Sequence, residues 1–357
     1  MVLRITVHRP INSFSIPIRI VGGTVILGII GIFSVIVATG LGPYDVSIRS
    51  TVGFFIGLTG INTIEVPNTH RAIIENIRIP RISMALLVGG GLSSAGVIMQ
   101  GVFRNNMADP GIIGVSAGGA VGAVIAISTG AALYSIWAIP GFAFVGSLVA
   151  MTLVFLIASS GGGVSVPTLL LAGIAIGAFL NSIISAVVLF SGDIDAQRQM
   201  MFWLAGGFDS TRWDTVKLVG PLIIVPVIVS IFFARDLNLI LVGEDQAQAL
   251  GIRVGLVRNF LLIVASIVTS VAVAYTGIIA FVGLVVPHVV RIILGPDHRV
   301  LLPLAFLTGS IFMLIADTLA RTLVSPAELR VGMVTALAGA PFFIFLLIKR
   351  RQQIFSL

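Results

Sequence analysis

The 357 residues contain no cysteine, and charged side chains make up only 10% of them. Without cysteine there is no disulfide framework, no thiol nucleophile and no thiolate metal ligand. Soluble domains carry about a quarter of their residues charged, whereas this chain is 57% hydrophobic with a mean hydropathy of +1.13. Composition therefore excludes an ordinary soluble globular protein and indicates a protein of the membrane.

Long stretches without Asp, Glu, Lys or Arg place the predicted membrane spans. A bilayer crossing needs about 20 apolar residues. Measured against that length, the uncharged runs predict ten helices, or nine if residues 259–290 hold one long helix. The runs are Ile20–Tyr44, Ile82–Phe103, Pro110–Gly192, Leu218–Ala234, Asn259–Val290, Val300–Ala316 and Val331–Ile348. The predicted fold class is all-α, a polytopic bundle of about ten transmembrane helices in a single domain over residues 1–357.

The formal charge of +7 does not come from a basic cluster, so it does not indicate a nucleic-acid partner. With ten spans and both termini in the cytoplasm, 12 of the 21 lysines and arginines lie on the cytoplasmic side, including Lys349-Arg350-Arg351. This distribution agrees with the positive-inside rule. The first apolar run is longer than a signal peptide and lacks a small-x-small cleavage site, which indicates an uncleaved first span. We therefore predict a multi-pass protein of the cytoplasmic (plasma or inner) membrane, surrounded by lipid.

The phosphate-binding loop G-x-x-x-x-G-K-[ST] is absent, because the two lysines, Lys217 and Lys349, follow Val216 and Ile348. No predicted span carries a row of ionisable residues, as ion-driven transporters often do. A transporter of this composition takes its energy from another subunit or works as a passive channel. A self-contained secondary transporter remains an alternative.

Residues 239–258 form an extended polar stretch between two hydrophobic runs. It contains two acids, Glu244 and Asp245, and Gly251 follows Asp245 six residues later. Acids at a helix start and glycine at its end favour a short helix, a turn and a second amphipathic piece. The predicted topology places this stretch in the cytoplasm, where it can be presented to a soluble partner.

Small residues gather in the second and third predicted spans. The stretch Gly89–Gly96 and the pair Gly118 and Gly122 allow helix backbones to approach closely in lipid. Gln100 and Asn105 are uncharged polar residues at a span end. They either satisfy the helix end or line a pathway, and the sequence favours neither role.

The segment Gly114-Val-Ser116-Ala-Gly118 matches the nucleophile pattern of serine hydrolases, with His288 as a candidate base of an intramembrane protease. With 40 glycines in the chain such a pattern arises easily by chance, so helix packing is the favoured interpretation. A structural role is also favoured for His288, which follows Pro287 near the end of its span.

Asp317 and Arg321 stand four residues apart in an otherwise apolar run. That spacing places both side chains on one helix face, where an acid and a base stabilise each other. The pair is either purely structural or faces a partner at the outer surface.

Ordered motifs along almost the whole chain resemble the permease subunits of the FecCD/BtuC type, which belong to type II ABC importers for iron-siderophores, haem and vitamin B12. The matching segments are 78–81 (Arg-Ile-Pro-Arg), 91–100, 105–120, 203–207 (Trp-Leu-Ala-Gly-Gly), 243–252, 277–288, 297–303, 316–321 and 326–332. So many matches in order are far more specific than any single motif above.

The resemblance implies a ten-helix permease that pairs with a second copy or a paralogue and encloses the pathway at their interface. It implies two ABC ATPase subunits docked from the cytoplasm and a substrate-binding protein docked from outside. The permease itself is then not an enzyme and holds no metal or cofactor, because the ATPase partners bind ATP and magnesium.

Family roles can be transferred to individual residues. Coupling to the ATPases is implied for Glu244, Asp245, Ala247, Ala249, Leu250, Gly251 and Ile252. Docking of the binding protein is implied for Arg78, Arg81 and Arg321, which lie outside in the predicted topology. Residues predicted to pack helices or line the pathway are Gly91, Gly96, Gln100, Asn105, Gly114, Ser116, Gly118, Pro287 and His288.

Two positions depart from the family pattern. Asn106 stands where the family usually has proline, and Arg330 replaces the proline of Glu-Leu-Pro-Val-Gly. The extra outer charge is expected to adjust docking. The resemblance predicts an importer of an iron chelate, with siderophore as the commonest family substrate, haem as the second candidate and vitamin B12 as the third; no residue decides among them.

Overall fold

The computed structural model describes residues 15–60, 64–160 and 165–355, and every regular element in these ranges is a helix. Arg4 and Arg9, which entered the predicted charge distribution, lie outside the described residues. The helices are α1 (Ile16–Gly40), α2 (Ile48–Gly57), α3 (Asn68–Ile73), η1 (Ile74–Arg78), α4 (Ile79–Val102), η2 (Pro110–Ile113), α5 (Val115–Ser128), α6 (Ala131–Tyr134), α7 (Ala138–Ser159), α8 (Val166–Phe190), α9 (Ile194–Leu204), α10 (Trp213–Phe232), α11 (Ala234–Val242), α12 (Glu244–Ala249), α13 (Val254–Thr276), α14 (Val282–Leu294), α15 (His298–Thr322) and α16 (Val331–Phe355).

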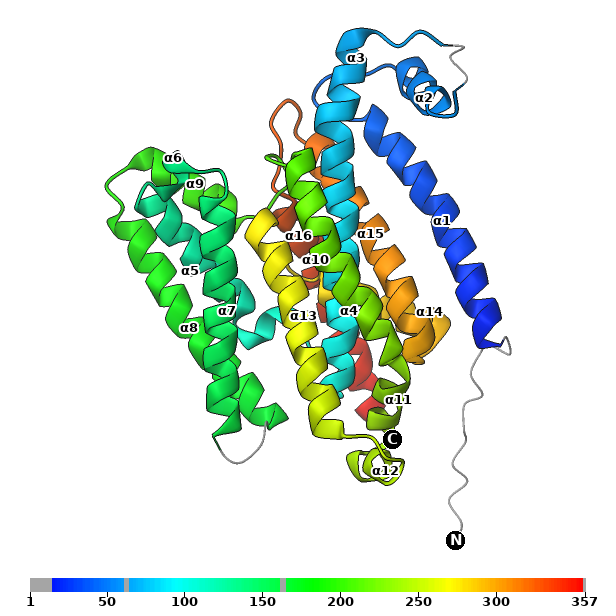
Figure 1. Cartoon of the computed structure of the whole chain (residues 1–357), viewed down its shortest axis with the longest axis vertical. Helices are drawn as coiled ribbons and strands as arrows, with labels where there is room; N and C mark the ends of the chain where they lie inside the picture. Colours follow the sequence, from blue (N-terminus) through cyan, green and yellow to red (C-terminus); the bar gives the residue numbers. More distant parts are fainter. Residues whose placement is uncertain (1–14, 61–63, 161–164, 356–357) are drawn as a thin grey trace.

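The predicted all-α transmembrane bundle is confirmed. Within the described ranges, seven helices are long and apolar enough to cross a membrane. Of the four shorter apolar helices, α5, α14 and α16 lie within the bundle and bring this set to ten, whereas α2 lies near α3 at one end (Figure 1). The first turn of α1 and the last turn of α16 lie at the same end as α12, and α3 lies at the opposite end (Figure 1). We call these the α12 end and the α3 end.

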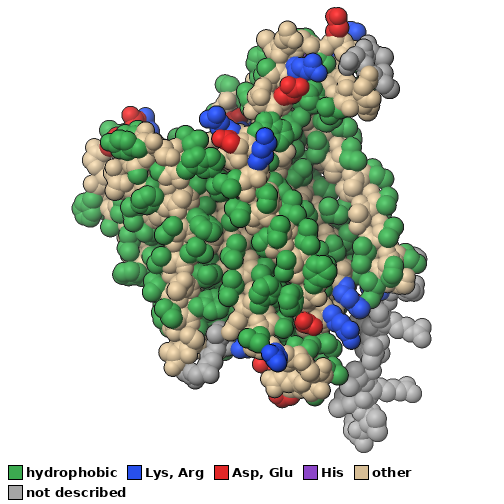
Figure 2. Space-filling model, in the orientation of Figure 1, with side chains coloured by type: hydrophobic (Ala, Val, Ile, Leu, Met, Phe, Trp, Pro, Cys, Tyr) green, Lys and Arg blue, Asp and Glu red, His purple; other side chains and the backbone are tan. Residues whose placement is uncertain are grey.

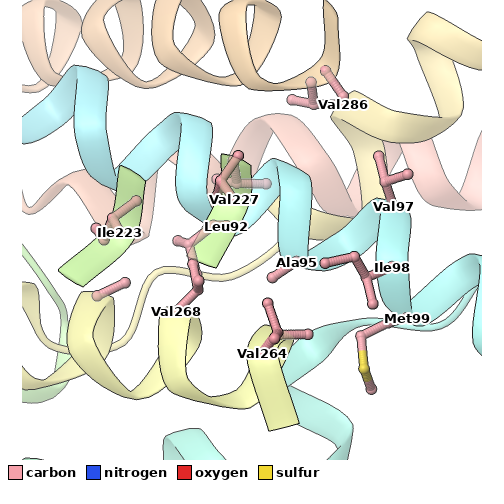
Figure 3. Close-up of a cluster of buried hydrophobic side chains, with 14 of the residues drawn as sticks. Leu92, Ala95, Val97, Ile98, Met99, Ile223, Val227, Val264, Val268 and Val286 are labelled. Carbon is pink, nitrogen blue, oxygen red and sulfur yellow. The ribbon is translucent and has the colours of Figure 1, made fainter. Parts of the chain in front are cut away.

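The helix α4 is the centre of the bundle. In its most apolar window 83% of the residues are buried, and it packs against α10, α13, α14 and α15. Figure 3 shows Leu92 and Ile98 of α4 among Ile223 of α10, Val264 of α13 and Val286 of α14. The continuous run through α3, η1 and α4 is 35 residues long. At about 1.5 Å per residue it exceeds a hydrocarbon core of roughly 30 Å, so α3 projects beyond the bundle (Figure 1).

The uncharged run 259–290 is broken in two, which confirms the predicted interruption near Gly277. The helix α13 ends at Thr276, and Gly277 has a φ of 70° that favours glycine. Four residues later Phe281, also at φ 70°, precedes α14. Because α14 is only 13 residues long, it measures roughly 20 Å and is shorter than the hydrocarbon core. The irregular residues before it are buried or half-buried by protein, as non-helical backbone at membrane depth requires.

Close helix contacts occur where the sequence is rich in glycine. A Cβ on Gly96 of α4 would collide with the backbone of Gly283 in α14, and one on Gly118 of α5 would collide with the backbone of Gly146 in α7. Such contacts let backbones pack directly, which is how helices associate in lipid.

Candidate functional site

The helix α12 and its turn form a compact cap on the α12 end of the bundle. The N–H of Ile252 donates to Ala247 O at 3.1 Å, and that of Gly251 donates to Gln248 O at 2.9 Å. With Gly251 at φ 85° this is the Schellman arrangement that ends a helix at glycine. The predicted short helix and glycine cap are confirmed. Within the predicted stretch 239–258, residues 239–242 belong to α11 and residues 254–258 to α13.

The residues of this cap divide between inward and outward positions. Ala247 is buried and packs with Ile240 of α11 and Val254 of α13, and Ile252 is half-buried beside them. Asp245, Ala249, Leu250 and Gly251 are exposed, and Leu250 is 67% accessible although apolar.

Glu244 differs from Asp245 because it has partners within the chain. Its carboxylate lies 3.3 Å from Arg104, after α4, and 3.5 Å from Arg258 of α13. Asp245 has no ion-pair or hydrogen-bond partner among the described residues. The cap therefore exposes the Asp245 carboxylate, which has no side-chain partner among the described residues, and the apolar side chain of Leu250.

At the α3 end, charged residues from distant parts of the chain meet in one cluster. We call it the outer ion cluster, after the side on which the predicted topology places these residues; its members are Arg78, Arg81, Asp209, Asp317, Arg321, Glu328 and Arg330.

Arg81 of α4 is the hub of the outer ion cluster. Its Nε and Nη2 donate to Asp317 Oδ1 at 3.0 and 2.9 Å, and its Nη1 donates to Glu328 at 2.8 Å. Asp209 is a further acid at 3.5 Å. Asp317 is completely buried and also pairs with Arg321 at 3.1 Å, so the predicted pairing four residues apart on α15 is confirmed.

Arg78 and Arg321 bind backbone carbonyls in the last turn of α1 and in the residues that follow it. Arg78 donates to Thr39 O and Tyr44 O, and Arg321 donates to Leu41 O at 3.1 Å and Ala38 O at 3.3 Å. Both arginines, like Arg81, are buried. Their role in docking a binding protein stays a prediction, and the contacts of all three guanidinium groups are internal.

Arg330, the departure from the family pattern, also turns inward. It forms an ion pair with Asp209, and its guanidinium lies 4.6 Å from the centre of the Phe202 ring on α9. The side chain thus connects the start of α16 to α9 and to the loop after it.

The residues predicted to pack helices or line the pathway fall into two groups. Gln100 and Pro287 are buried at helix contacts, and Gln100 Nε2 donates to Leu284 O at 3.2 Å while Arg291 Nη1 donates to Gln100 Oε1 at 2.7 Å. A Cβ on Gly91 would lie 2.8 Å from Ile223 of α10. These residues and Gly96 hold α4 against α10 and α14, and Gly118 holds α5 against α7.

The second group lies in or beside the turn between α4 and α5. Asn105 is exposed, and its side chain accepts from Met107 N at 3.0 Å, which closes the turn locally. Gly114 has a φ of 80° and precedes the first residue of α5, a conformation that explains the glycine without invoking catalysis. Ser116 lies in the first turn of α5, which packs mainly on α7 and α8. His288 lies on α14, which packs mainly on α4 and α15, so the main helix contacts do not bring the two together.

A polar junction near the α12 end was missed by sequence reasoning. Asn238 of α11 donates to Asp297 Oδ1 at 2.7 Å and accepts from His298 N at 2.9 Å. The guanidinium of Arg299, assisted by Asn238, lowers the pKa of the Asp297 carboxyl to about 2, so this acid is charged at neutral pH. The available signal was a single asparagine within the apolar run Leu237–Leu241.

The comparisons with known proteins agree with this geometry. The FecCD transport family matches residues 29–349, which is nearly all of the described bundle. The chain belongs to the FecCD transport family. It is therefore an ABC importer permease of the FecCD/BtuC type and a multi-pass membrane protein.

Named relatives match most of their own length. The chain is 45% identical over 288 residues to the cobalamin import system permease BtuC of Halobacterium salinarum, covering 81% of this chain and 76% of that one. It is 42% identical over 281 residues to the hemin transport system permease HmuU of Yersinia pestis, covering 78% and 84%. A solved metal-chelate type ABC transporter in an inward-facing conformation superimposes with a TM-score of 0.81 at 29% identity, covering 93% of this chain and 99% of that one.

Proposed function

We propose that this FecCD-family permease moves a bulky metal chelate into the cytoplasm, driven by separate ATPase subunits that dock on α12. The observation that carries the proposal is the family match over residues 29–349. The cap formed by α12 supports it, because Asp245 and Leu250 project from one end of the bundle and provide a charge and an apolar contact for a partner.

The orientation follows from the same proposal. The α12 end, with the start of α1 and the end of α16, faces the cytoplasm. The α3 end faces the binding protein. A second permease copy or a paralogue completes the pathway. In alternating access the helices then move as rigid bodies between two packing arrangements. The close glycine contacts of α4 keep neighbouring helices together during that movement.

For the cargo we favour a metal macrocycle over the predicted iron-siderophore. Support comes from the two named relatives, a cobalamin permease at 45% identity and a hemin permease at 42%. Iron-siderophore stays a prediction to be tested in the same assay.

The test is reconstitution of the chain in proteoliposomes with its ATPase and binding protein. We expect ATP-dependent uptake of cyanocobalamin or hemin, and no uptake when the ATPase is omitted. Uptake by the permease alone, driven by an ion gradient, would contradict the proposal and establish a secondary transporter. Binding of ferric siderophores and neither macrocycle by the binding protein would overturn the cargo assignment only.

A further inference from the structure

Asn238 joins the helix before α12 to the first turn of α15. Its Nδ2 donates to Asp297 Oδ1 at 2.7 Å, and its Oδ1 accepts from both His298 N at 2.9 Å and His298 Nδ1 at 2.8 Å. Asp297 is the N-cap of α15 and accepts from Arg299 N at 3.0 Å. The Asn238 amide therefore donates to the N-cap residue of α15, Asp297, and accepts from its first residue, His298.

The same junction reaches the central helix. His298 and Leu237 are completely buried. A Cβ on Gly101, in the last turn of α4, would lie 2.8 Å from His298 Nε2 and 3.2 Å from Leu237. The ends of α11, α15 and α4 are thus in direct contact, with no space for α11 to shift without displacing the other two.

From this junction α4 and α15 run together to the outer ion cluster. Halfway along, Gly89 and Gly309 are in backbone contact, and Ser310 Oγ donates to Leu86 O at 2.7 Å. At the far end Arg81 of α4 holds Asp317 of α15. Because contacts at both ends and the middle join the two helices, they form one rigid strut across the bundle.

The cap formed by α12 and its turn has a second, weaker connection to the end of α4. Glu244 meets Arg104 at 3.3 Å, with side chains 42% and 38% exposed. Ion pairs at such exposure contribute little and are screened by salt. Breaking the Asn238 junction instead leaves polar groups of a buried histidine unpaired, which is costly. Of these two polar connections, the Asn238 junction is therefore the one whose loss costs more, and it acts beside the apolar packing of α11 on α4 and α15.

We propose that Asn238 is a positioning residue that transmits displacement of the α12 cap to the α4–α15 strut, and so to the outer ion cluster. This inference rests on the proposed function. It makes Asn238 necessary for coupling ATP hydrolysis to transport, while it takes no part in binding the ATPase or the cargo.

The test uses the full complex with Asn238→Leu, which removes the donor and the acceptor at similar volume, and Asn238→Ser, which keeps a smaller hydroxyl. Leu241→Ala, at an exposed position of the same helix, is the control. Uptake and ATP hydrolysis are measured together in proteoliposomes. Movement at the α3 end is followed by the ATP-dependent change in maleimide labelling of a cysteine introduced at Ser210, an exposed residue next to Asp209. The permease has no cysteine of its own to compete for the label.

With Asn238→Leu we expect unchanged ATPase binding, at least about a fivefold loss of uptake per ATP, and loss of the ATP-dependent labelling change at position 210. Asn238→Ser should show a smaller loss in the same direction, and it decides the question if Asn238→Leu does not fold. A wild-type ratio and labelling change in the folded variants would overturn this inference alone. A wild-type complex without ATP-dependent uptake would overturn the proposed function and, with it, this inference.

Discussion

Arg81 and Asp317 are 236 positions apart and form a buried ion pair in which Arg81 Nε and Nη2 lie 3.0 and 2.9 Å from the same carboxylate oxygen. Asp317 is completely buried and is also 3.1 Å from Arg321. One carboxylate thus balances two guanidinium groups from two helices. A buried arrangement of this kind depends on every member, because a remaining charge without a partner is expensive.

Asp317→Asn should therefore strongly destabilise the protein. The change leaves Arg81 and Arg321 without their shared counter-charge, and removal of one partner from a buried pair costs about 3–5 kcal/mol. Thermal unfolding of the detergent-solubilised chain measures the effect. Asp195→Asn is the matched control, since Asp195 is 92% exposed and 3.8 Å from Arg198. Equal unfolding temperatures for the two variants would show that the outer ion cluster is not a stabilising unit.

Arg81→Gln separates an internal role from direct docking. Because Arg81 is buried against Asp317 and Glu328, we expect the unfolding temperature and the affinity for the binding protein to fall together. Arg71→Gln, which removes an arginine that is 59% exposed, should leave the unfolding temperature unchanged. If Arg81→Gln lowers the affinity at an unchanged unfolding temperature, the docking prediction holds and the internal assignment is wrong.

Gly96→Ala should disrupt the contact between α4 and α14. The added methyl group would meet the backbone of Gly283 rather than a movable side chain, and overpacking of this kind costs about 1–3 kcal/mol. Gly28→Ala on α1 is the control, because its Cβ meets nothing within 4 Å. Yield of folded protein and uptake should both fall for Gly96→Ala alone. An active Gly96→Ala variant of normal yield would mean that the two helices can separate without loss.

Local features of this structure were predictable and remote contacts were not. The break at Gly277 and the cap at Gly251 depend on glycine at positive φ, which leaves a trace in the sequence itself. The pairing of Asp317 with Arg321 follows from helix periodicity. The partnership of Arg81 with Asp317 depends on how two helices pack, and no local pattern encodes it. Arg78 binds backbone carbonyls, which every residue possesses, so its burial could not be inferred from residue types.

Asp245→Lys should weaken association with the ATPase more than Glu244→Gln does. Glu244 is held by Arg104 and Arg258 within the chain, so its loss removes contacts inside the permease, of which the exposed pair with Arg104 is worth about 0–1 kcal/mol. Asp245 is exposed and uncommitted among the described residues, and the lysine would place the opposite charge at the proposed interface. Copurification at low and high salt measures the difference, which should shrink as salt screens the charge. A larger effect for Glu244→Gln at both salt concentrations would show that α12 acts through its internal contacts instead.

Arg330 should hold α9 against the start of α16 through a measurable interaction with Phe202. The guanidinium lies 4.6 Å from the ring centre, and Phe202 is 55% exposed. A cation over an aromatic ring at an exposed site contributes about 0.5–1 kcal/mol.

A double-mutant cycle of Arg330→Gln with Phe202→Leu, followed by thermal unfolding, should give a coupling energy in that range. The control cycle pairs Arg330→Gln with Phe232→Leu, an exposed residue that ends α10 at the α12 end. Distant sites of this kind are additive to within about 0.5 kcal/mol. On the face shown in Figure 2, Lys, Arg, Asp and Glu side chains gather at the two ends of the bundle, and mainly hydrophobic side chains lie between them. Additive effects of Arg330→Gln and Phe202→Leu would show that the cation and the ring do not interact, and the ion pair with Asp209 would then account for the inward orientation of Arg330.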